Sequence, residues 1–379
     1  MFYFFSFFED SVSWFRLFDY ITVRTLGAAT FGFLITLIIG PGLIKKMRKI
    51  NFVECNIDER LSQNDKKSKI KTPSMGGIII IISTVTSSLL WGNPLNLFLV
   101  LSIGTLIFMG LIGFIDDYKK IKNKNGLSVK AKSLLQIMWT IIFLSILWAF
   151  PETQQKVKEL MVPFNKIPIL EMSFIGALIF LIFVMVGATN AVNLADGLDG
   201  LAIGCTNSVI GCYLLLAYIA GHYSFATYLQ VPFISGSGEL TVFCGALLGS
   251  GLGFLWFNRN PAEIFMGDTG SLALGGAIAS VAILIKQELL LIIVGGVFVA
   301  EALSVILQTT YFKYSRYKTG KGRRIFKCAP IHHHYELIEK EKAMLKNLDP
   351  RYVENIIVVK FWIAGIICAL IGIATLKIR

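Results

Sequence analysis

The sequence predicts an all-α integral membrane protein with ten transmembrane helices, both termini outside and a polar cleft on the cytoplasmic side. Of its 379 residues, 55% are hydrophobic and only 16% are charged, whereas about a quarter of a soluble domain is charged. Ten separate segments each carry about 20 apolar residues, enough to cross a hydrocarbon core of roughly 30 Å. The composition excludes a soluble enzyme and a disordered chain, and six cysteines without a CxxC pair exclude a disulfide scaffold.

An aromatic segment precedes the first predicted span. Ten of the first twenty residues are aromatic, and the stretch has neither a basic region nor a small-residue cleavage site. It carries Glu9 and Asp10 instead, so a removable signal peptide is not expected. Aromatic side chains concentrate at membrane–water interfaces, and we therefore expect this segment to lie at the interface.

The predicted spans follow in order, each an apolar run bounded by charged or turn residues. The break between the eighth and ninth spans rests only on the three residues Lys286 to Glu288. After the fourth span, the stretch PETQQKVKELM predicts an external surface helix, and residues 336–352 predict a charged cytoplasmic helix. Without repeats or a Gly/Ser-rich linker, residues 1–379 form one predicted domain. The spans are 21–44, 74–91, 95–115, 133–150, 172–190, 201–221, 239–257, 270–286, 289–311 and 356–376.

The distribution of basic residues predicts the topology. The loops that follow odd-numbered spans hold 27 Lys and Arg residues, and those that follow even-numbered spans hold four. Cytoplasmic loops of multi-pass proteins carry the excess of basic residues. The odd-to-even loops are therefore predicted to be cytoplasmic, and the net charge of +12 needs no nucleic-acid partner.

Two aspartate clusters lie at span ends on the predicted cytoplasmic side. Asp116 and Asp117 follow an apolar run, at a predicted helix C-terminus where the macrodipole disfavours negative charge. A compensating lysine or divalent cation is therefore expected. Asn193, Asp196 and Asp199 repeat at a spacing of three, with glycines that allow a ligand to approach the backbone. For Asp199, helix capping is an equal alternative.

A third cluster contains the stretch FMGDTGS at 265–271. Asp268 in this stretch has capping as an equal alternative to a functional role. Phe265 stands beside a Gly-Asp turn and offers a stacking surface, although plain packing is the commoner role of such a residue. Carboxylates, hydroxyls and amides without thiolates suit a hard ion such as Mg²⁺.

Basic side chains are expected on the same side of the membrane. Four lysines between residues 66 and 71 precede the run TPSMGG at 72–77. Lysines at a helix entrance are by default lipid-headgroup contacts, but glycines and hydroxyls there also make an anion site. The triplet of His332, His333 and His334 cannot all face one metal ion, which favours phosphate binding or proton handling.

Two polar side chains interrupt the ninth predicted span. Glu301 and Gln308 lie two helical turns apart in an otherwise apolar segment. Intramembrane polar groups indicate a functional site by default, and a hydrogen bond between helices is the equal alternative.

Acids, lysines and histidines on one face of a hydrophobic scaffold suit metal-assisted phosphoryl transfer between a soluble anionic donor and a lipid acceptor. In the same order and over essentially the whole chain, these motifs resemble those of the phospho-N-acetylmuramoyl-pentapeptide-transferase family. That family is a branch of the polyprenyl-phosphate N-acetylhexosamine-1-phosphate transferases. The motifs are TPSMGG, where Ser74 replaces the family's usual Thr, then Asp116-Asp117, NLADGLDG at 193–200, FMGDTGS and APIHHHYE at 329–336.

The resemblance implies transfer of phospho-MurNAc-pentapeptide from UDP-MurNAc-pentapeptide to undecaprenyl phosphate in a bacterial inner membrane. The products would be lipid I and UMP, in the first membrane step of peptidoglycan synthesis, with Mg²⁺ as cofactor. It also implies that Asp268 holds the Mg²⁺ and that Asp116 and Asp117 face the lipid phosphate, with Asp116 as the base. A homodimer is an expectation from the family alone.

The resemblance further implies the substrate contacts. The histidine triplet would lie near the phosphates, Phe265 would stack on uracil, and Lys69 and Asn258 would contact the nucleoside. Gln308 would lie at the nucleoside end of the cleft. The complete implied substrate-binding set is Lys69, Ser74, Lys120, Lys132, Asn193, Asp196, Asp199, Asn258, Phe265, Gly267 and Gln308.

Two rival functions and two mechanisms stay open at this point. A sister transferase would place GlcNAc-1-phosphate on the same lipid, although the APIHHHYE loop argues against it. A polytopic transporter would place its site near the bilayer midplane, whereas the acidic groups here gather at span ends. The transfer itself proceeds either by direct attack of the lipid phosphate, which is favoured, or through a covalent intermediate on an aspartate.

Overall fold

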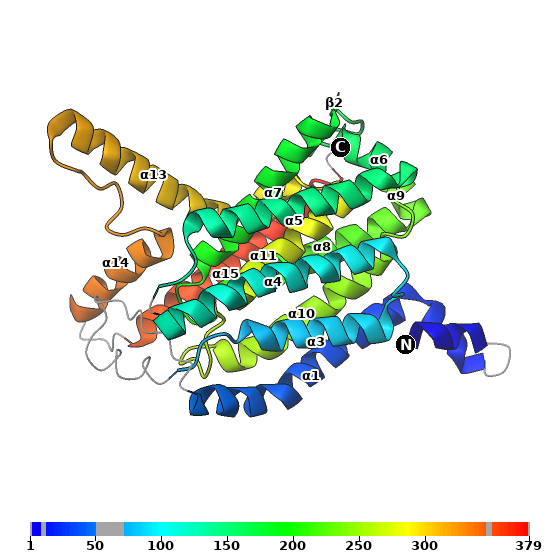
Figure 1. Cartoon of the computed structure of the whole chain (residues 1–379), viewed down its shortest axis with the longest axis horizontal. Helices are drawn as coiled ribbons and strands as arrows, with labels where there is room; N and C mark the ends of the chain where they lie inside the picture. The colour runs from blue at the N-terminus through cyan, green and yellow to red at the C-terminus, as the bar shows by residue number, and fades with distance from the viewer. Residues whose placement is uncertain (1, 9–12, 51–71, 124, 346–350, 378–379) are drawn as a thin grey trace.

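The computed structural model describes residues 2–8, 13–50, 72–123, 125–345 and 351–377. Long helices run roughly side by side in one bundle (Figure 1). The short helices α6 (Pro151–Lys158) and α9 (Tyr223–Leu229) lie at one end of it, and α14 (Ile331–Leu345) lies at the other. The segments predicted to be external and the segment predicted to be cytoplasmic thus lie at opposite ends of the bundle.

Each predicted span corresponds to helical structure. The helices are α1 (Ile21–Lys49), α3 (Gly77–Trp91), α4 (Leu97–Asn123), α5 (Val129–Ala149), α7 (Phe174–Ala195), α8 (Leu201–Gly221), α10 (Gly238–Asn258), α11 (Gly267–Leu284), α12 (Leu290–Val294), α13 (Gly296–Thr319) and α15 (Arg351–Ala374). Within the described ranges, eight helices are long and apolar enough to cross a membrane. The chain is therefore a multi-pass membrane protein with mainly helical structure.

Two predicted spans differ from a single continuous crossing helix. The second, α3, has only 15 residues, about 22 Å at 1.5 Å per residue. The ninth is broken at Gly295, where α12 ends and α13 begins. Glycine weakens a helix because its backbone loses the most entropy on folding, and two glycines adjoin here. The count of ten spans is thus not fixed by helix length.

The helix α11 forms the centre of the bundle and packs against α4, α7, α3 and α8. Its sequence is rich in Gly, Ala and Ser, and every residue from Thr269 to Leu284 is buried. Small side chains let neighbouring helix backbones approach closely in membrane proteins. The first turn of α11 therefore lies directly against its neighbours, and this turn carries Asp268.

The turn between α11 and α12 is more buried than its polar sequence suggests. Lys286 and Glu288 are each only 2% exposed, and the Lys286 Nζ lies 2.6 Å from the Glu288 Oε1. The Tyr213 hydroxyl donates a hydrogen bond of 2.9 Å to the carbonyl of Gln287. The two charges neutralise each other, so the turn can sit inside the bundle.

The polar segments outside the spans are partly as predicted. The helix that was expected to be external ends at Lys158. It is followed by an antiparallel hairpin of two short strands, β1 (Glu159–Leu160) and β2 (Leu170–Glu171), which the all-α prediction did not include. The predicted cytoplasmic helix begins five residues early, at Ile331, and residues 346–350 lie outside the described ranges. The aromatic segment forms two 3₁₀ helices, Phe2–Phe8 and Ser13–Asp19, and the Phe2 ring lies 4.7 Å from Trp91.

Candidate active site

The helix α4 carries the paired aspartates. Asp116 and Asp117 are buried, but they do not lie at a helix C-terminus as the span boundaries predicted, because α4 continues to Asn123. The extra turns place Lys120 one helical turn beyond Asp116, with its Nζ 2.9 Å from the Asp116 Oδ2. The expected positive compensation is thus supplied by the same helix.

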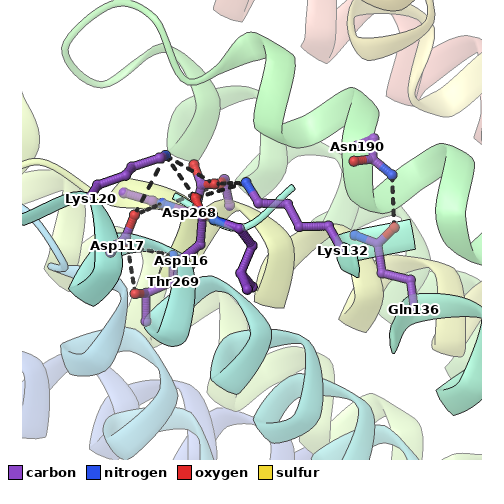
Figure 2. A network of polar contacts seen from close by, with 11 residues as sticks. Asp116, Asp117, Lys120, Lys132, Gln136, Asn190, Asp268 and Thr269 are labelled. Atoms are coloured by element: carbon purple, nitrogen blue, oxygen red, sulfur yellow. Dashed lines mark hydrogen bonds and ion pairs between the residues drawn. The ribbon is translucent and has the colours of Figure 1, made fainter. Parts of the chain in front are cut away.

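Asp116 and Asp268 share two lysines (Figure 2). The Lys120 Nζ lies 3.2 Å from the Asp268 Oδ2, and the Lys132 Nζ lies 2.8 Å from the Asp116 Oδ2 and also pairs with Asp268. Lys132 comes from the first turn of α5. The backbone N–H of Leu127 donates to the Asp116 Oδ1 at 2.5 Å. Four charged side chains from three helices therefore form one compact network.

Asp117 is held differently, by the first turn of α11. Its carboxylate accepts hydrogen bonds from the backbone N–H of Asp268 at 3.1 Å, from that of Thr269 at 2.9 Å, and from the Thr269 hydroxyl at 2.7 Å. Free N–H groups and the positive end of the helix dipole make this terminus a site for negative charge. Asp117 thereby fixes α4 to α11.

Glycines allow the elements around the network to approach each other. A Cβ on Gly113 would lie 2.1 Å from the Asp268 carbonyl oxygen, so only glycine permits this spacing of α4 and α11. Gly267 has a φ of +71°, and a Cβ there would lie 2.7 Å from the Asp117 Oδ2 and 3.0 Å from the Ser74 Oγ. Ser74 is therefore a buried neighbour of the acidic network, and it comes from the TPSMGG run.

The TPSMGG run is bound to the FMGDTGS run through the backbone. The N–H of Gly76 donates to the Phe265 carbonyl at 2.8 Å, and the N–H of Phe265 donates to the Pro73 carbonyl at 2.8 Å. Phe265 itself is half-buried. Two of the sequence motifs thus form one continuous loop structure beside Asp268.

The three carboxylates meet the requirements of a hard cation. Asp116, Asp117 and Asp268 each offer one oxygen, and these atoms lie within 4.8 Å of one another. The donors are all oxygens, which Mg²⁺ prefers. Three negative charges against the two lysines leave a net charge of −1, so a divalent cation would be favoured electrostatically. The residues present therefore fit the ion that the sequence suggests.

The NLADGLDG motif lies at the end of α7 and is tied to the loop after α10. The Asn258 Oδ1 accepts from the Gly200 N–H at 3.1 Å, and the Asn258 Nδ2 donates to the Ile264 carbonyl at 2.9 Å. The Asp199 Oδ2 accepts from the Ala262 N–H at 3.0 Å. Asn258 and Asp199 are buried and hold these loops, whereas Asn193 and Asp196 are half-buried at the C-terminal end of α7.

The histidine triplet opens α14 and adjoins the NLADGLDG motif. A Cβ on Gly197 would lie 2.3 Å from the His332 Nε2. His332 is fully buried, and its Nδ1 lies 3.1 Å from the Glu301 Oε2 on α13. Glu301 thus takes the interhelical role that the sequence left open, with a motif histidine as its partner.

The other two histidines have local partners. The His333 Nδ1 lies 2.8 Å from the Glu336 Oε2, and the His334 Nδ1 accepts from the Lys327 N–H at 3.1 Å. Although burial acts to raise it, hydrogen bonds from His333 and Lys340 lower the pKa of Glu336 to about 2. The three rings therefore have three different environments, as expected for side chains that cannot share one ion.

Two further predicted contacts have different outcomes. The Gln308 Oε1 accepts from the N–H groups of Ile325 and Phe326 at 3.0 Å each, and its Nε2 donates to the Phe326 carbonyl at 3.1 Å. Its amide is thus used within the protein, to clamp the chain that returns from α13. Lys69 lies outside the described residues.

Some residues of the site were not recognised in the sequence. The Thr269 hydroxyl donates a hydrogen bond to Asp117. Gln136 lies one turn of α5 beyond Lys132, and its Oε1 accepts a hydrogen bond of 2.9 Å from the Asn190 Nδ2 (Figure 2). The Glu354 Oε1 accepts from the Asp199 N–H at 3.3 Å. The sequence feature that could have identified Gln136 and Asn190 is their position as polar residues within predicted spans, where polar side chains indicate function by default.

The fold and this network define a multi-pass membrane protein with a buried oxygen-rich site at one end of its bundle. Comparison with known families matches residues 97–286 to the model of glycosyl transferase family 4. The chain is 47% identical over 369 residues to the phospho-N-acetylmuramoyl-pentapeptide-transferase of Desulfotalea psychrophila, covering 96% of each chain. It is 44% identical to that of Desulfatibacillum aliphaticivorans, with 96% of each covered, and 43% identical to that of Syntrophus aciditrophicus, with 98% of each covered.

This similarity extends over nearly the whole length of both partners, well beyond the level at which a family is shared. The chain belongs to the phospho-N-acetylmuramoyl-pentapeptide-transferase family and is a transferase. The resemblance in the motifs is thereby confirmed.

Proposed function

We propose that this protein transfers phospho-MurNAc-pentapeptide from UDP-MurNAc-pentapeptide to undecaprenyl phosphate, giving lipid I and UMP for peptidoglycan synthesis. The observation that carries the proposal is the buried network of three carboxylates and two lysines in a chain of this family. Both substrates are anionic, so their encounter requires a site that screens phosphate from phosphate.

The topology proposed for the chain has ten crossings, external termini and a site at the cytoplasmic face of the bacterial inner membrane. Its support is the distribution of Lys and Arg, 27 against four in the alternating loops. In this arrangement the short α3 and the broken α12–α13 pair count as crossings. The nucleotide donor is water-soluble and would then reach the site from the cytoplasm.

An apolar groove suits the polyprenyl chain of the acceptor. It has a volume of about 320 Å³ and lies between α7, α12 and α13, lined by residues that include Phe180, Phe183 and Phe298. On α7 it extends to Val192, which immediately precedes Asn193 of the NLADGLDG motif. A lipid tail in this groove would direct its phosphate toward the polar end of the bundle.

The cofactor proposed is Mg²⁺, with Asp268, Asp116 and Asp117 as the residues that would hold it. When bound, the ion would neutralise phosphate charge and act as a Lewis acid on a phosphoryl oxygen. A homodimer is carried over from the resemblance alone, and the mass of the solubilised protein would test it.

The chain's own residues have separable roles in the proposed transfer. Lys120 and Lys132 screen the two phosphates and stabilise charge that moves to the leaving UMP. A phosphate monoester has a second pKa near 6, so most of the acceptor is already deprotonated at pH 7. Asp116 would accept the remaining proton. Both oxygens of Asp117 already accept hydrogen bonds, which favours direct attack by the lipid phosphate over a covalent intermediate on Asp117.

The experiment is UMP release by purified, detergent-solubilised protein with undecaprenyl phosphate, given UDP-MurNAc-pentapeptide or UDP-GlcNAc, in Mg²⁺ and then in EDTA. Mg²⁺-dependent UMP release only with the muramoyl donor is the expected result. Release from UDP-GlcNAc instead would assign the protein to the sister branch. No release with either donor, from folded protein, would overturn the proposal and favour the transporter.

A further inference from the structure

The end of α13 and the chain that returns from it form a projecting arm, residues 308–327, here called the basic arm. Figure 1 shows α13 leaving the bundle at an angle, with the following segment turning back toward α14. Gln308 clamps the base of the arm, and the Ser315 Oγ accepts from the Arg323 N–H at 2.8 Å nearer the tip. The arm is therefore a defined structure, held by its own hydrogen bonds.

The basic arm carries one sign of charge. The chain has no Asp or Glu between Glu301 and Glu336. Among the ion pairs of the described residues, only Lys327 of the arm takes part, with Glu341 at 2.5 Å. The side chains of all seven basic residues are exposed: Lys313, Arg316, Lys318, Lys321, Arg323, Arg324 and Lys327.

The side chains along α13 change character in the order in which a membrane changes. Leu303, Ile306 and Leu307 are exposed apolar residues close to the bundle. Exposed tyrosines follow at 311, 314 and 317, and Tyr317 is 92% exposed. The basic residues begin among these tyrosines and continue to the tip. From Leu303 to Tyr317 the helix extends about 21 Å along its own axis, longer than the roughly 15 Å of half a hydrocarbon core, so it can reach from the interior to the headgroups while inclined.

We propose that the basic arm binds the phosphate groups of anionic phospholipids at the membrane surface. Tyrosine is preferred at the interface, and clusters of Lys and Arg next to a membrane helix attract anionic headgroups. The six basic residues without a carboxylate partner in the described chain are free to make these contacts. The proposal depends on the proposed topology only for the choice of leaflet, and it does not depend on the proposed reaction.

The test compares lipid retention by wild-type protein and by a variant with Lys318→Gln, Lys321→Gln, Arg323→Gln and Arg324→Gln. The proteins are incubated in detergent with equimolar phosphatidylglycerol and phosphatidylcholine, and retained lipids are counted by native mass spectrometry. The matched control replaces by Gln four exposed lysines that lie on separate elements and do not form one cluster: Lys166, Lys342, Lys360 and Lys377. We expect the arm variant to lose about tenfold in preference for phosphatidylglycerol, corresponding to about 1.4 kcal/mol, and the control to lose less than twofold.

Equal retention by the arm variant, or an equal loss in the control, would overturn the proposal. If the fourfold variant does not elute as folded protein, the pairs Lys318/Lys321 and Arg323/Arg324 are changed separately, and the same criteria apply. UMP release is measured beside the lipid count. A raised KM for the nucleotide donor with unchanged lipid retention would assign the arm to the donor's phosphates and would also overturn the proposal. Because lipid retention needs no turnover, its outcome stands apart from that of the proposed reaction.

Discussion

Asp117 and Asp268 face each other across α4 and α11 but depend on different partners. Asp117 accepts three hydrogen bonds from N–H and hydroxyl donors of the α11 terminus, so it fixes α4 to α11 in addition to offering an oxygen to a cation. Asp268 instead shares Lys120 and Lys132 with Asp116 and keeps part of its carboxylate accessible, with its side chain 13% exposed. Asp268 is therefore the carboxylate best placed to exchange a lysine contact for a cation.

Replacing Asp268 by Asn should lower the rate of UMP release by about 10²–10⁴ and leave the protein folded. The change keeps the shape of the side chain but removes the negative charge, so the network no longer carries an excess negative charge for a divalent ion. The rate is measured over a series of Mg²⁺ concentrations, with the thermal unfolding temperature as the control for folding. Near-normal turnover at limiting Mg²⁺ would rule out the metal role.

Replacing Lys132 by Met should lower turnover by roughly 10–100-fold, because one of the two cations that screen the phosphates is lost. Lys130 offers a matched control, since it lies in the same first turn of α5 but is exposed. Its Met variant should stay within about twofold of the wild type. The two variants are compared by their steady-state rates of UMP release. Equal losses of rate would show that the position of Lys132 in the network is unimportant and that only the net charge of the protein affects turnover.

At the scale of the element, α14 links the histidine triplet to its own acidic residues. Glu336 lies between His333 and Lys340, whose Nζ lies 2.7 Å from the Glu336 Oε1, and its pKa falls from 4.5 to about 2. A carboxylate whose pKa is lower in the folded state stabilises the fold above its unfolded pKa. That contribution is lost as the pH falls from about 4.5 through about 2.

Replacing Glu336 by Gln should therefore destabilise the protein at pH 7, by about 1–3 kcal/mol, and the difference from wild type should narrow steadily below pH 4.5. Thermal unfolding in detergent between pH 7 and pH 2.5 measures it. Glu341→Gln is the control on the same helix, because Glu341 is exposed and its pair with Lys327 should contribute about 0–1 kcal/mol. A gap that stays constant with pH would contradict the assigned ion pairing.

Hydropathy predicted the positions of the eight described helices that are long and apolar enough to cross a membrane, because burial in lipid demands about 20 apolar residues from the local sequence alone. The break at Gly295 coincides with two adjacent glycines, whereas the burial of Lys286 depends on how the turn packs into the bundle. Lys286 could be placed outside by charge, but its pairing with Glu288 is visible only in three dimensions. The sequence thus predicted the turn at residues 286–288 but not its burial, which the pairing of the two charges allows.

The sequence predicted that acidic residues gather on one side of the membrane, and the structure brings Asp116, Asp117 and Asp268 together. Their individual contacts could not be predicted. Which acid pairs with which lysine was not predictable, because Asp117 and Thr269 are 152 residues apart and meet only when α11 packs on α4. Conversely, Asn258 was expected to contact the nucleoside and Gln308 to lie at the nucleoside end of the cleft, and the structure shows the amides of both bonded to the protein's own backbone.

At the scale of the whole molecule, the β1–β2 hairpin and α14 lie at opposite ends of the bundle, so one labelling experiment tests the proposed topology (Figure 1). Lys166 before β2 and Lys342 on α14 are both exposed. Each is changed separately to Cys in a background that carries Cys328→Ser and Cys368→Ser, which remove two partly exposed thiols, and Cys55→Ser. A membrane-impermeant maleimide should label the Lys166→Cys protein in intact spheroplasts and the Lys342→Cys protein only after permeabilisation.

The distribution of basic residues predicts which of the two cysteines is accessible from outside, because the reverse orientation would place 27 basic residues outside. If only the Lys342→Cys protein were labelled in intact spheroplasts, the orientation would be the reverse of the proposed one. If both proteins were labelled, the number of crossings between residues 166 and 342 could not be odd. The expected pattern requires α7, α8, α10, α11 and the α12–α13 pair to act as five crossings. The experiment thus also tests whether the helix broken at Gly295 spans the membrane as one unit, which helix length alone does not determine.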